Sequence, residues 1–149
     1  MTDTCPLTGL KNILVATDGS AYSEKALHEA INLAKACNTK LHVMSVVEVN
    51  EEYEALAPQL VEKADEEARS FLNAARKDAE KENVSCDIIV HRGEDPAQFI
   101  IEEAEKLKAD MIVMGKHGRK KGLRKLLIGS ITRKVVSHAN CKVMIVPGN

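Results

Sequence analysis

The sequence predicts an α/β fold: one domain built on an open parallel β-sheet with helices on both faces. Five short apolar runs, bounded by glycine, proline or polar residues, are typical of strands that are buried on both faces. The segments between them repeat apolar residues every three or four positions, which indicates amphipathic helices. Strands and helices that alternate in this way form a parallel sheet with right-handed crossovers. A chain of 149 residues suffices for one such domain.

We expect residues 1–10 to be a loose leader, and residues 11–149 to form the α/β domain. The first strand is predicted at 13–17, because four apolar residues follow one another there. It runs into the Asp-Gly-Ser sequence at 18–20, which is typical of a turn from a strand to a helix. Ligand-binding residues are therefore expected close to this turn.

Ser20 or Ser23 can cap the first helix, and Asn38 is its expected stop. The second strand is predicted at 41–47. We expect the acidic stretch 48–57 to be a loop that the following proline closes. A long helix comes next, and its predicted buried stripe is formed by Leu60, Ala64, Ala68, Phe71, Ala75 and Ala79.

The remaining elements follow the same order of strand and helix. The third strand is predicted at 86–90, and the next helix has Asp95 as its N-cap and Pro96 at its first position. The fourth strand is predicted at 110–114 and the last at 141–146. Proline and glycine then end the final strand.

A glycine-spaced basic stretch, residues 115–130, separates the last two strands, and Ser130 is expected to open a short helix. Glycines let backbone N–H groups approach a ligand, while Ser130 and Thr132 add hydroxyl groups at the helix start. Arg133 and Lys134 are unfavourable in a first helical turn unless an anion lies there. The pattern predicts a phosphate cradle. The alternative is a turn whose cations are simply solvated.

The position of this stretch predicts a crevice. Ligands of open parallel sheets bind at the carboxyl ends of the strands, near the topological switch point. If the first and fourth strands are neighbours, the turn at Asp18 and the loop from Gly115 form the two lips of one crevice. The sequence has no Gly-x4-Gly-Lys-Ser/Thr, and no Gly-x-Gly-x-x-Gly follows the first strand. This argues against a P-loop NTPase and an ordinary dinucleotide enzyme.

Composition argues against other classes of protein. The net charge of −1 and a sequence with two Tyr, two Phe and no Trp argue against a nucleic-acid-binding protein. No apolar run is long enough to span a bilayer and no signal peptide is recognisable, so we expect a cytoplasmic location. The four cysteines form no Cys-x-x-Cys pair, and we expect reduced, mostly buried thiols. The histidines have no metal-ligand spacing.

The motifs at 17–20, 93–96, 114–118 and 129–130, together with the closing strand at 139–146, resemble the universal stress protein family. The resemblance covers almost the whole chain. It implies a five-stranded parallel sheet of order 3-2-1-4-5 and a homodimer. One subgroup of the family binds ATP through Gly-x2-Gly-x9-Gly-Ser/Thr; here the second gap is one residue longer.

Carried over by position, the resemblance implies a site for ATP or another adenine nucleotide, with or without magnesium. The residues that would offer backbone amides and a hydroxyl group to the phosphates are Gly115, Gly118, Gly129, Ser130 and Ile131. The residues that would surround the adenosine are Ala16, Thr17, Asp18 and Val46.

These expectations favour an ATP-binding stress or signalling switch, whose loop at 115–130 changes the surface shown to a protein partner. One alternative is a slow ATPase or phosphotransfer enzyme that uses Asp18 or His117, although no catalytic triad or carboxylate pair supports fast chemistry. Another is an interaction module that has lost nucleotide binding. In the implied strand order the last strand lies at an apolar edge, which predicts a two-fold dimer through 141–146.

Overall fold

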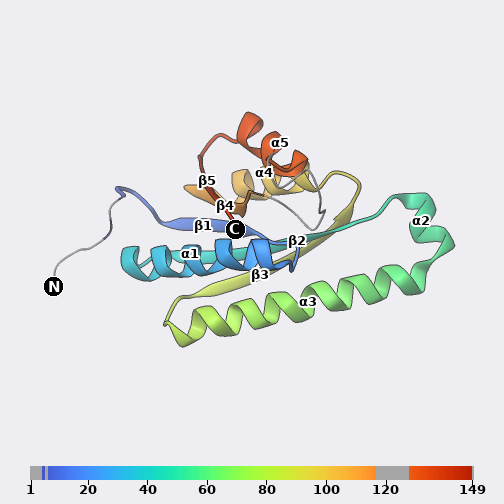
Figure 1. Cartoon of the computed structure of the whole chain (residues 1–149), viewed down its shortest axis with the longest axis horizontal. Coiled ribbons are helices and arrows are strands. Elements are labelled where there is room, and N and C mark those ends of the chain that lie inside the picture. Colours follow the sequence, from blue (N-terminus) through green and yellow to red (C-terminus); the bar gives the residue numbers. More distant parts are fainter. Residues whose placement is uncertain (1–4, 6, 117–127, 149) are drawn as a thin grey trace.

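The computed structural model describes residues 5, 7–116 and 128–148, in which strands and helices alternate along the chain (Figure 1). The strands are β1 (Asn12–Ala16), β2 (Lys40–Glu48), β3 (Cys86–Gly93), β4 (Met111–Gly115) and β5 (Lys142–Val146). The helices are α1 (Ala21–Cys37), α2 (Glu51–Leu56), α3 (Pro58–Lys81), α4 (Pro96–Leu107) and α5 (Ser130–His138).

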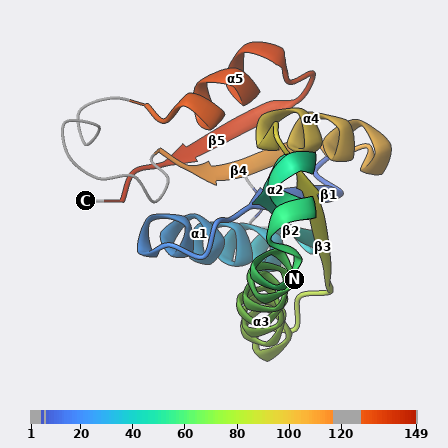
Figure 2. The same cartoon turned by 90° about the vertical axis from the view of Figure 1, so that its right-hand side faces the viewer.

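The five strands form one parallel sheet in the order β3-β2-β1-β4-β5. Helices α1 and α3 lie on one face of this sheet, and α4 and α5 lie on the other (Figure 2). The predicted fold class and strand order are therefore confirmed. The chain reverses its direction of winding between β1 and β4, which makes this the switch point of the sheet.

Two hydrophobic layers hold the helices to the sheet, and β1 contributes to both. Ile13 and Val15 pack in the layer with α1 and α3, whereas Leu14 packs in the layer with α4 and α5. All three side chains are fully buried. Successive side chains of a strand point to opposite faces, so an uninterrupted apolar run is what a strand covered on both sides requires.

The predicted helix caps are present. The Ser20 side chain accepts a hydrogen bond of 3.3 Å from the Ser23 N–H, and Asn38 ends α1 in a left-handed conformation with φ 52°. At α4 the Asp95 carboxylate accepts from the Gln98 N–H at 3.2 Å, with proline at the first helical position. Both caps are made by residues within the same helix start, so the local sequence is enough to predict them.

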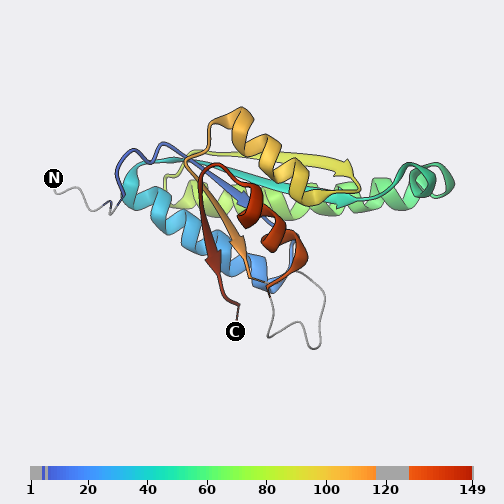
Figure 3. The same ribbon diagram turned by 90° about the horizontal axis from the view of Figure 1, so that it is seen from above.

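The acidic stretch after β2 is helical, so our expectation of a loop is wrong. The Asn50 side chain accepts a hydrogen bond of 2.7 Å from the Tyr53 N–H and caps α2. Glu51 and Glu52 lie in the first turn, where negative charges stabilise the positive end of the helix dipole. With α2, the start of α3 extends away from the sheet (Figure 3).

The buried stripe of α3 differs in phase from the predicted one. Leu60 is 56% exposed, and Asp65 is buried although it is charged. Arg69 and Arg92 donate to the Asp65 carboxylate at 2.8 and 3.3 Å, and the bond from Arg69 is the main reason that its pKa is lowered. The residues buried along α3 are Val61, Asp65, Ala68, Leu72, Ala75 and Ala79.

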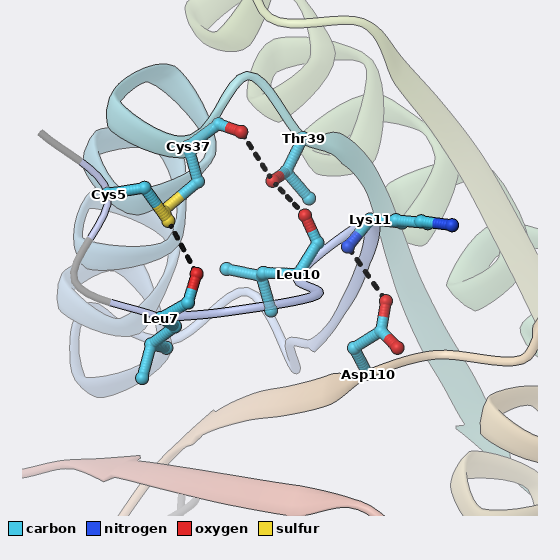
Figure 4. The surroundings of a disulfide bond; sticks show 7 residues. All are labelled: Cys5, Leu7, Leu10, Lys11, Cys37, Thr39 and Asp110. Atoms are coloured by element: carbon cyan, nitrogen blue, oxygen red, sulfur yellow. Dashed lines mark hydrogen bonds between the residues drawn. A yellow bond between two sulfur atoms is a disulfide. The ribbon is translucent and has the colours of Figure 1, made fainter. Parts of the chain in front are cut away.

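The segment just before β1 is attached to the domain, whereas we expected a loose leader. Leu10 is buried in the layer with α1, and its carbonyl accepts a hydrogen bond of 2.9 Å from the Thr39 hydroxyl. The Asp110 carboxylate accepts from the backbone N–H groups of Lys11 and Asn12 at 2.8 and 2.9 Å. These contacts join the segment to the loops on both sides of β1 (Figure 4).

Cys5 and Cys37 form a disulfide, so the expectation of four reduced thiols is wrong for this pair. Cys37 is the last residue of α1, and the segment before β1 passes alongside that end of the helix (Figure 4). Cys86 and Cys141 are free thiols, as expected. Within the described residues, no helix combines the length and the apolar character needed to cross a membrane.

Candidate functional site

A step at the carboxyl ends of the strands creates the site. β1 pairs with β2 only as far as Ala16 and Met44, whereas β2 continues to Glu48 alongside β3. On the other side, β1 pairs with β4 only as far as Val15 and Val113. A space therefore remains between β2 and β4 beyond the end of β1. It lies at the switch point, where ligands of such sheets bind.

A cavity of about 500 Å³ occupies this space, a volume in the range of small-molecule sites. The turn after β1 forms one side of the cavity, and Gly115 at the end of β4 and Gly129 just before α5 line another. β2, α3, the start of α4 and the start of α5 complete the wall. Besides the predicted positions, the lining includes Ser23, Met44, Ser45, Val47, Glu48, Ala64, Glu67, Ala68, Phe71, Pro96, Ile100, Met114 and Thr132.

The predicted site residues come together here. All of them except Gly118 line this one cavity, namely Ala16, Thr17, Asp18, Val46, Gly115, Gly129, Ser130 and Ile131. Gly118 lies outside the described residues, as do His117 and the basic residues that follow it. β1 and β4 are neighbours, and Asp18 lines the same cavity as the two ends of the basic stretch, Gly115 and Gly129.

The turn after β1 forms one lip and is held by its own polar groups. The Asp18 carboxylate accepts from the Ser20 N–H at 2.9 Å and from the Ser23 hydroxyl at 3.1 Å. The Thr17 and Ser23 hydroxyl oxygens are 2.7 Å apart, and Gly19 adopts a positive φ of 79° that suits glycine. The carboxylate is thus fixed at the cavity as an acceptor, suited to an amino or hydroxyl group.

The other lip is the start of α5. The Gly129 N–H donates to the Lys116 carbonyl at 2.9 Å, and the Thr132 hydroxyl donates to the Gly115 carbonyl at 2.9 Å. These bonds fasten the two ends of the basic stretch together. They also correct our prediction, because the Gly129 amide and the Thr132 hydroxyl are already used within the protein.

Donors remain at this helix terminus. The first bond within α5 runs from the Arg133 N–H to the Gly129 carbonyl at 2.9 Å. The N–H groups of Ser130 and Ile131 precede it, so they have no partner within the helix. Both residues line the cavity. The positive end of the α5 dipole therefore faces the cavity, with donors available for an anion.

One cation in the first turns of α5 has a partner within the protein. The Lys134 ammonium group forms an ion pair with the Asp95 carboxylate at the start of α4. The hydrogen bond from Lys134 is the main reason that the pKa of Asp95 is lowered. Lys134 therefore does not require a bound anion, and the evidence for an anion site comes from the helix terminus.

Several lining residues were not predicted as site residues. Phe71 and Glu67 come from α3, and both lie on the side of that helix whose apolar members we expected to be buried. The apolar residues at spacings of three and four along α3 were the signal in the sequence. This spacing does not distinguish a helix face packed in the core from one that lines a cavity. Among the described residues, no cluster of three or more His, Cys, Asp or Glu side chains could hold a metal.

Comparisons with known proteins identify the family of this chain. The model of the universal stress protein family matches residues 9–147. The chain belongs to the universal stress protein family. Universal stress protein MJ0531 of Methanocaldococcus jannaschii is 37% identical over 140 residues, which span 91% of this chain and 81% of that protein. The resemblance stated from the motifs is confirmed at the level of the family.

Solved structures of this family share the fold. The structure of hypothetical protein MJ0577 is 28% identical, with a TM-score of 0.81, and the match covers 93% of this chain and 96% of that one. A universal stress protein in complex with cAMP is 26% identical, with a TM-score of 0.67, and the match covers 94% of this chain and 98% of that one.

Proposed function

We propose that this universal stress protein binds an adenine nucleotide, ATP in the first instance, in the cavity beyond β1. One observation carries the proposal. The residues chosen from sequence motifs in separate parts of the chain, except Gly118, line a single cavity of about 500 Å³. The cAMP complex of a related family member supports the same class of ligand.

The two lips of the cavity suit different parts of the nucleotide. The N–H groups of Ser130 and Ile131 and the dipole of α5 favour phosphate at that end. The Asp18 carboxylate would repel phosphate, and it suits the base or the ribose hydroxyl groups as an acceptor. The apolar wall includes Val46 and the aromatic ring of Phe71, against which a base can pack.

The proposed ligand would contact both ends of the basic stretch. Gly115 and Gly129 line the cavity, and the bonds at Lys116 and Thr132 tie these ends to one another. We infer that nucleotide binding, through these contacts at Gly115 and Gly129, changes the surface that the protein shows to its partners. This is the sense in which the protein would work as a stress or signalling switch.

Titration calorimetry of the nucleotide-stripped protein tests the binding proposal. We expect ATP to bind with a dissociation constant at or below the millimolar concentrations of a cell, with and without magnesium. An absence of heat and of any thermal shift with ATP would contradict the proposal.

We also propose that two copies of the chain pair through β5. This strand lies at the edge of the sheet, and Val143, Met144 and Ile145 are only half-buried in the single chain. Light scattering should show a dimer at micromolar concentration. Met144→Lys should convert it to a monomer, whereas Val136→Lys on the exposed side of α5 should not. A monomeric wild-type protein would refute this pairing.

A further inference from the structure

A pair of cysteines lies at the end of the sheet opposite to the cavity. Cys37 ends α1, and Cys5 belongs to the segment that precedes β1. Their Cα atoms are 4.5 Å apart although the residues are separated by 32 positions in sequence. The cavity instead lies at the carboxyl end of β1 and the start of α1. The pair therefore belongs to a different part of the molecule.

The four cysteines differ in their accessibility to a reagent. Cys5 and Cys37 are both partly exposed, whereas Cys86 is buried on β3. Burial raises the pKa of the Cys86 thiol to about 11, and burial also raises the pKa of the Cys141 thiol. The thiolate is the reactive form of cysteine. Cys86 and Cys141 are consequently poor reactants, and neither forms a disulfide in this structure.

We propose that Cys5 and Cys37 form a reversible thiol-oxidation site, which small disulfides of the glutathione type oxidise and which fastens the N-terminal segment to α1. The geometry of the pair carries this assignment, since the folded domain already places the two side chains in contact (Figure 4). The exposed surroundings allow a small reagent to reach them.

The reaction is a thiol–disulfide exchange in two steps. The thiolate of one cysteine attacks a sulfur of the glutathione disulfide, whose S–S bond breaks, and one glutathione thiolate leaves. The second cysteine, as thiolate, attacks the protein sulfur of this mixed disulfide and releases the second glutathione. Two protein thiols are oxidised, one glutathione disulfide is reduced, and the two thiol protons pass to the two glutathione thiolates. Excess glutathione reverses both steps.

The domain does not depend on this bond for its fold. Leu7 and Leu10 pack against the layer under α1, and the Thr39 hydroxyl and the Asp110 carboxylate hold the segment through the hydrogen bonds already described. The bond chiefly restricts the unfolded chain, in which it closes a loop between positions separated by 32 residues. Oxidation should therefore raise stability without creating a new fold.

The test uses the full chain in glutathione redox buffers, with alkylation and intact mass to count free thiols. In oxidising buffer we expect two free thiols and an intramolecular disulfide, and peptide mapping should place it between Cys5 and Cys37. The melting temperature of the oxidised form should exceed that of the reduced form by roughly 10 °C, from loop-closure entropy. A Cys86→Ser/Cys141→Ser variant should form the same disulfide with the same rise in melting temperature, and its oxidised form should have no free thiol.

Cys5→Ser and Cys37→Ser are the matched variants, because each removes one partner at a partly exposed position. We expect both to melt near the reduced wild type in either buffer, with no intramolecular disulfide. Four free thiols in oxidising wild-type protein would overturn the proposal. A disulfide that involves Cys86 or Cys141, or equal melting temperatures for the two redox forms, would do so as well.

Discussion

Ser130→Glu is expected to weaken ATP binding about 100-fold while it leaves the domain folded. Ser130 is exposed, opens α5 and lines the cavity. A glutamate at this position places a negative charge next to the negatively charged phosphates of the proposed ligand. At a separation of about 5 to 6 Å and an effective dielectric constant of about 20, one pair of charges repels by about 3 kcal/mol.

The same substitution favours the helix itself, which makes the test selective. Acidic residues stabilise the first turn of a helix by about 0.3–1 kcal/mol, and the first turn of α5 has none. We therefore expect an unchanged or slightly higher melting temperature together with the loss of ATP affinity. Calorimetry and thermal denaturation of the same sample measure the two effects.

Two controls are needed. One separates the effect of the charge from that of side-chain size, and the other separates phosphate binding from binding of the base. Ser130→Gln has nearly the volume of the glutamate variant without its charge, so it should lose much less affinity for ATP. Adenosine has no phosphate, and its affinity should be similar in all three proteins. Equal weakening by glutamine and glutamate would exclude the electrostatic explanation. Unchanged ATP affinity in Ser130→Glu would exclude phosphate binding at α5.

Ile112→Ala should have the largest effect on stability, a loss of about 3–4 kcal/mol in the free energy of unfolding. Ile112 is fully buried in β4, where it pairs with Leu14 of β1 and Val143 of β5. Its side chain belongs to the layer with α4 and α5. The substitution leaves a cavity that these helices cannot fill without moving. The loss therefore includes both the hydrophobic transfer free energy of the removed atoms and the cost of the cavity.

Urea denaturation of the reduced protein measures this loss, with Val136→Ala as the control. Val136 also carries a branched apolar side chain, but it is 47% exposed on α5, so its removal should cost less than about 0.5 kcal/mol. A similar small effect at both positions would contradict the two-layer core. Loss of cooperativity in Ile112→Ala alone would still agree with it.

The fold was predictable because its signals are local and repeated. The uninterrupted apolar runs at 13–16 and 111–114 have few roles other than strands covered on both faces. The Ser20 and Asp95 caps each depend on a backbone group three residues away, so the local sequence is enough to predict them. The strand order needed the family resemblance, because alternation of strands and helices is compatible with several orders.

The errors arise where a residue's partner lies far away in the sequence. Asp65 is buried with Arg92 of β3 and Arg69 as hydrogen-bond partners, and the contact with Arg92 could not be predicted from the spacing of α3. Cys5 meets Cys37 through the path of the N-terminal segment, which no spacing rule describes. The α2 helix is a different case, since Asn50 and the following glutamates were available as a start signal.

The position of the cavity could be predicted from the sequence, but the backbone N–H groups that remain available to a ligand could not. Motif residues from β1, β2, β4 and α5 all line the cavity, because parallel strands end at the same edge of a sheet. The Gly129 N–H donates to the Lys116 carbonyl. These two residues lie at opposite ends of the basic stretch, and no local pattern in the sequence predicts this hydrogen bond. Phe71 belongs to the predicted apolar stripe of α3, but apolar spacing alone does not show that this residue and Glu67 line a cavity.

The most direct test of nucleotide binding in this cavity is a titration of ATP into isotope-labelled protein, followed by the NMR shifts of backbone amides. We expect the largest changes at 16–18, at Val46, at Gly115 and at 129–131, with small changes in β3 and at the Cys5–Cys37 end of the sheet. Saturation of these shifts at millimolar ATP or below is the predicted result. No shifts at that concentration, or shifts centred on α2 or β5, would contradict the assignment of this cavity as the nucleotide site.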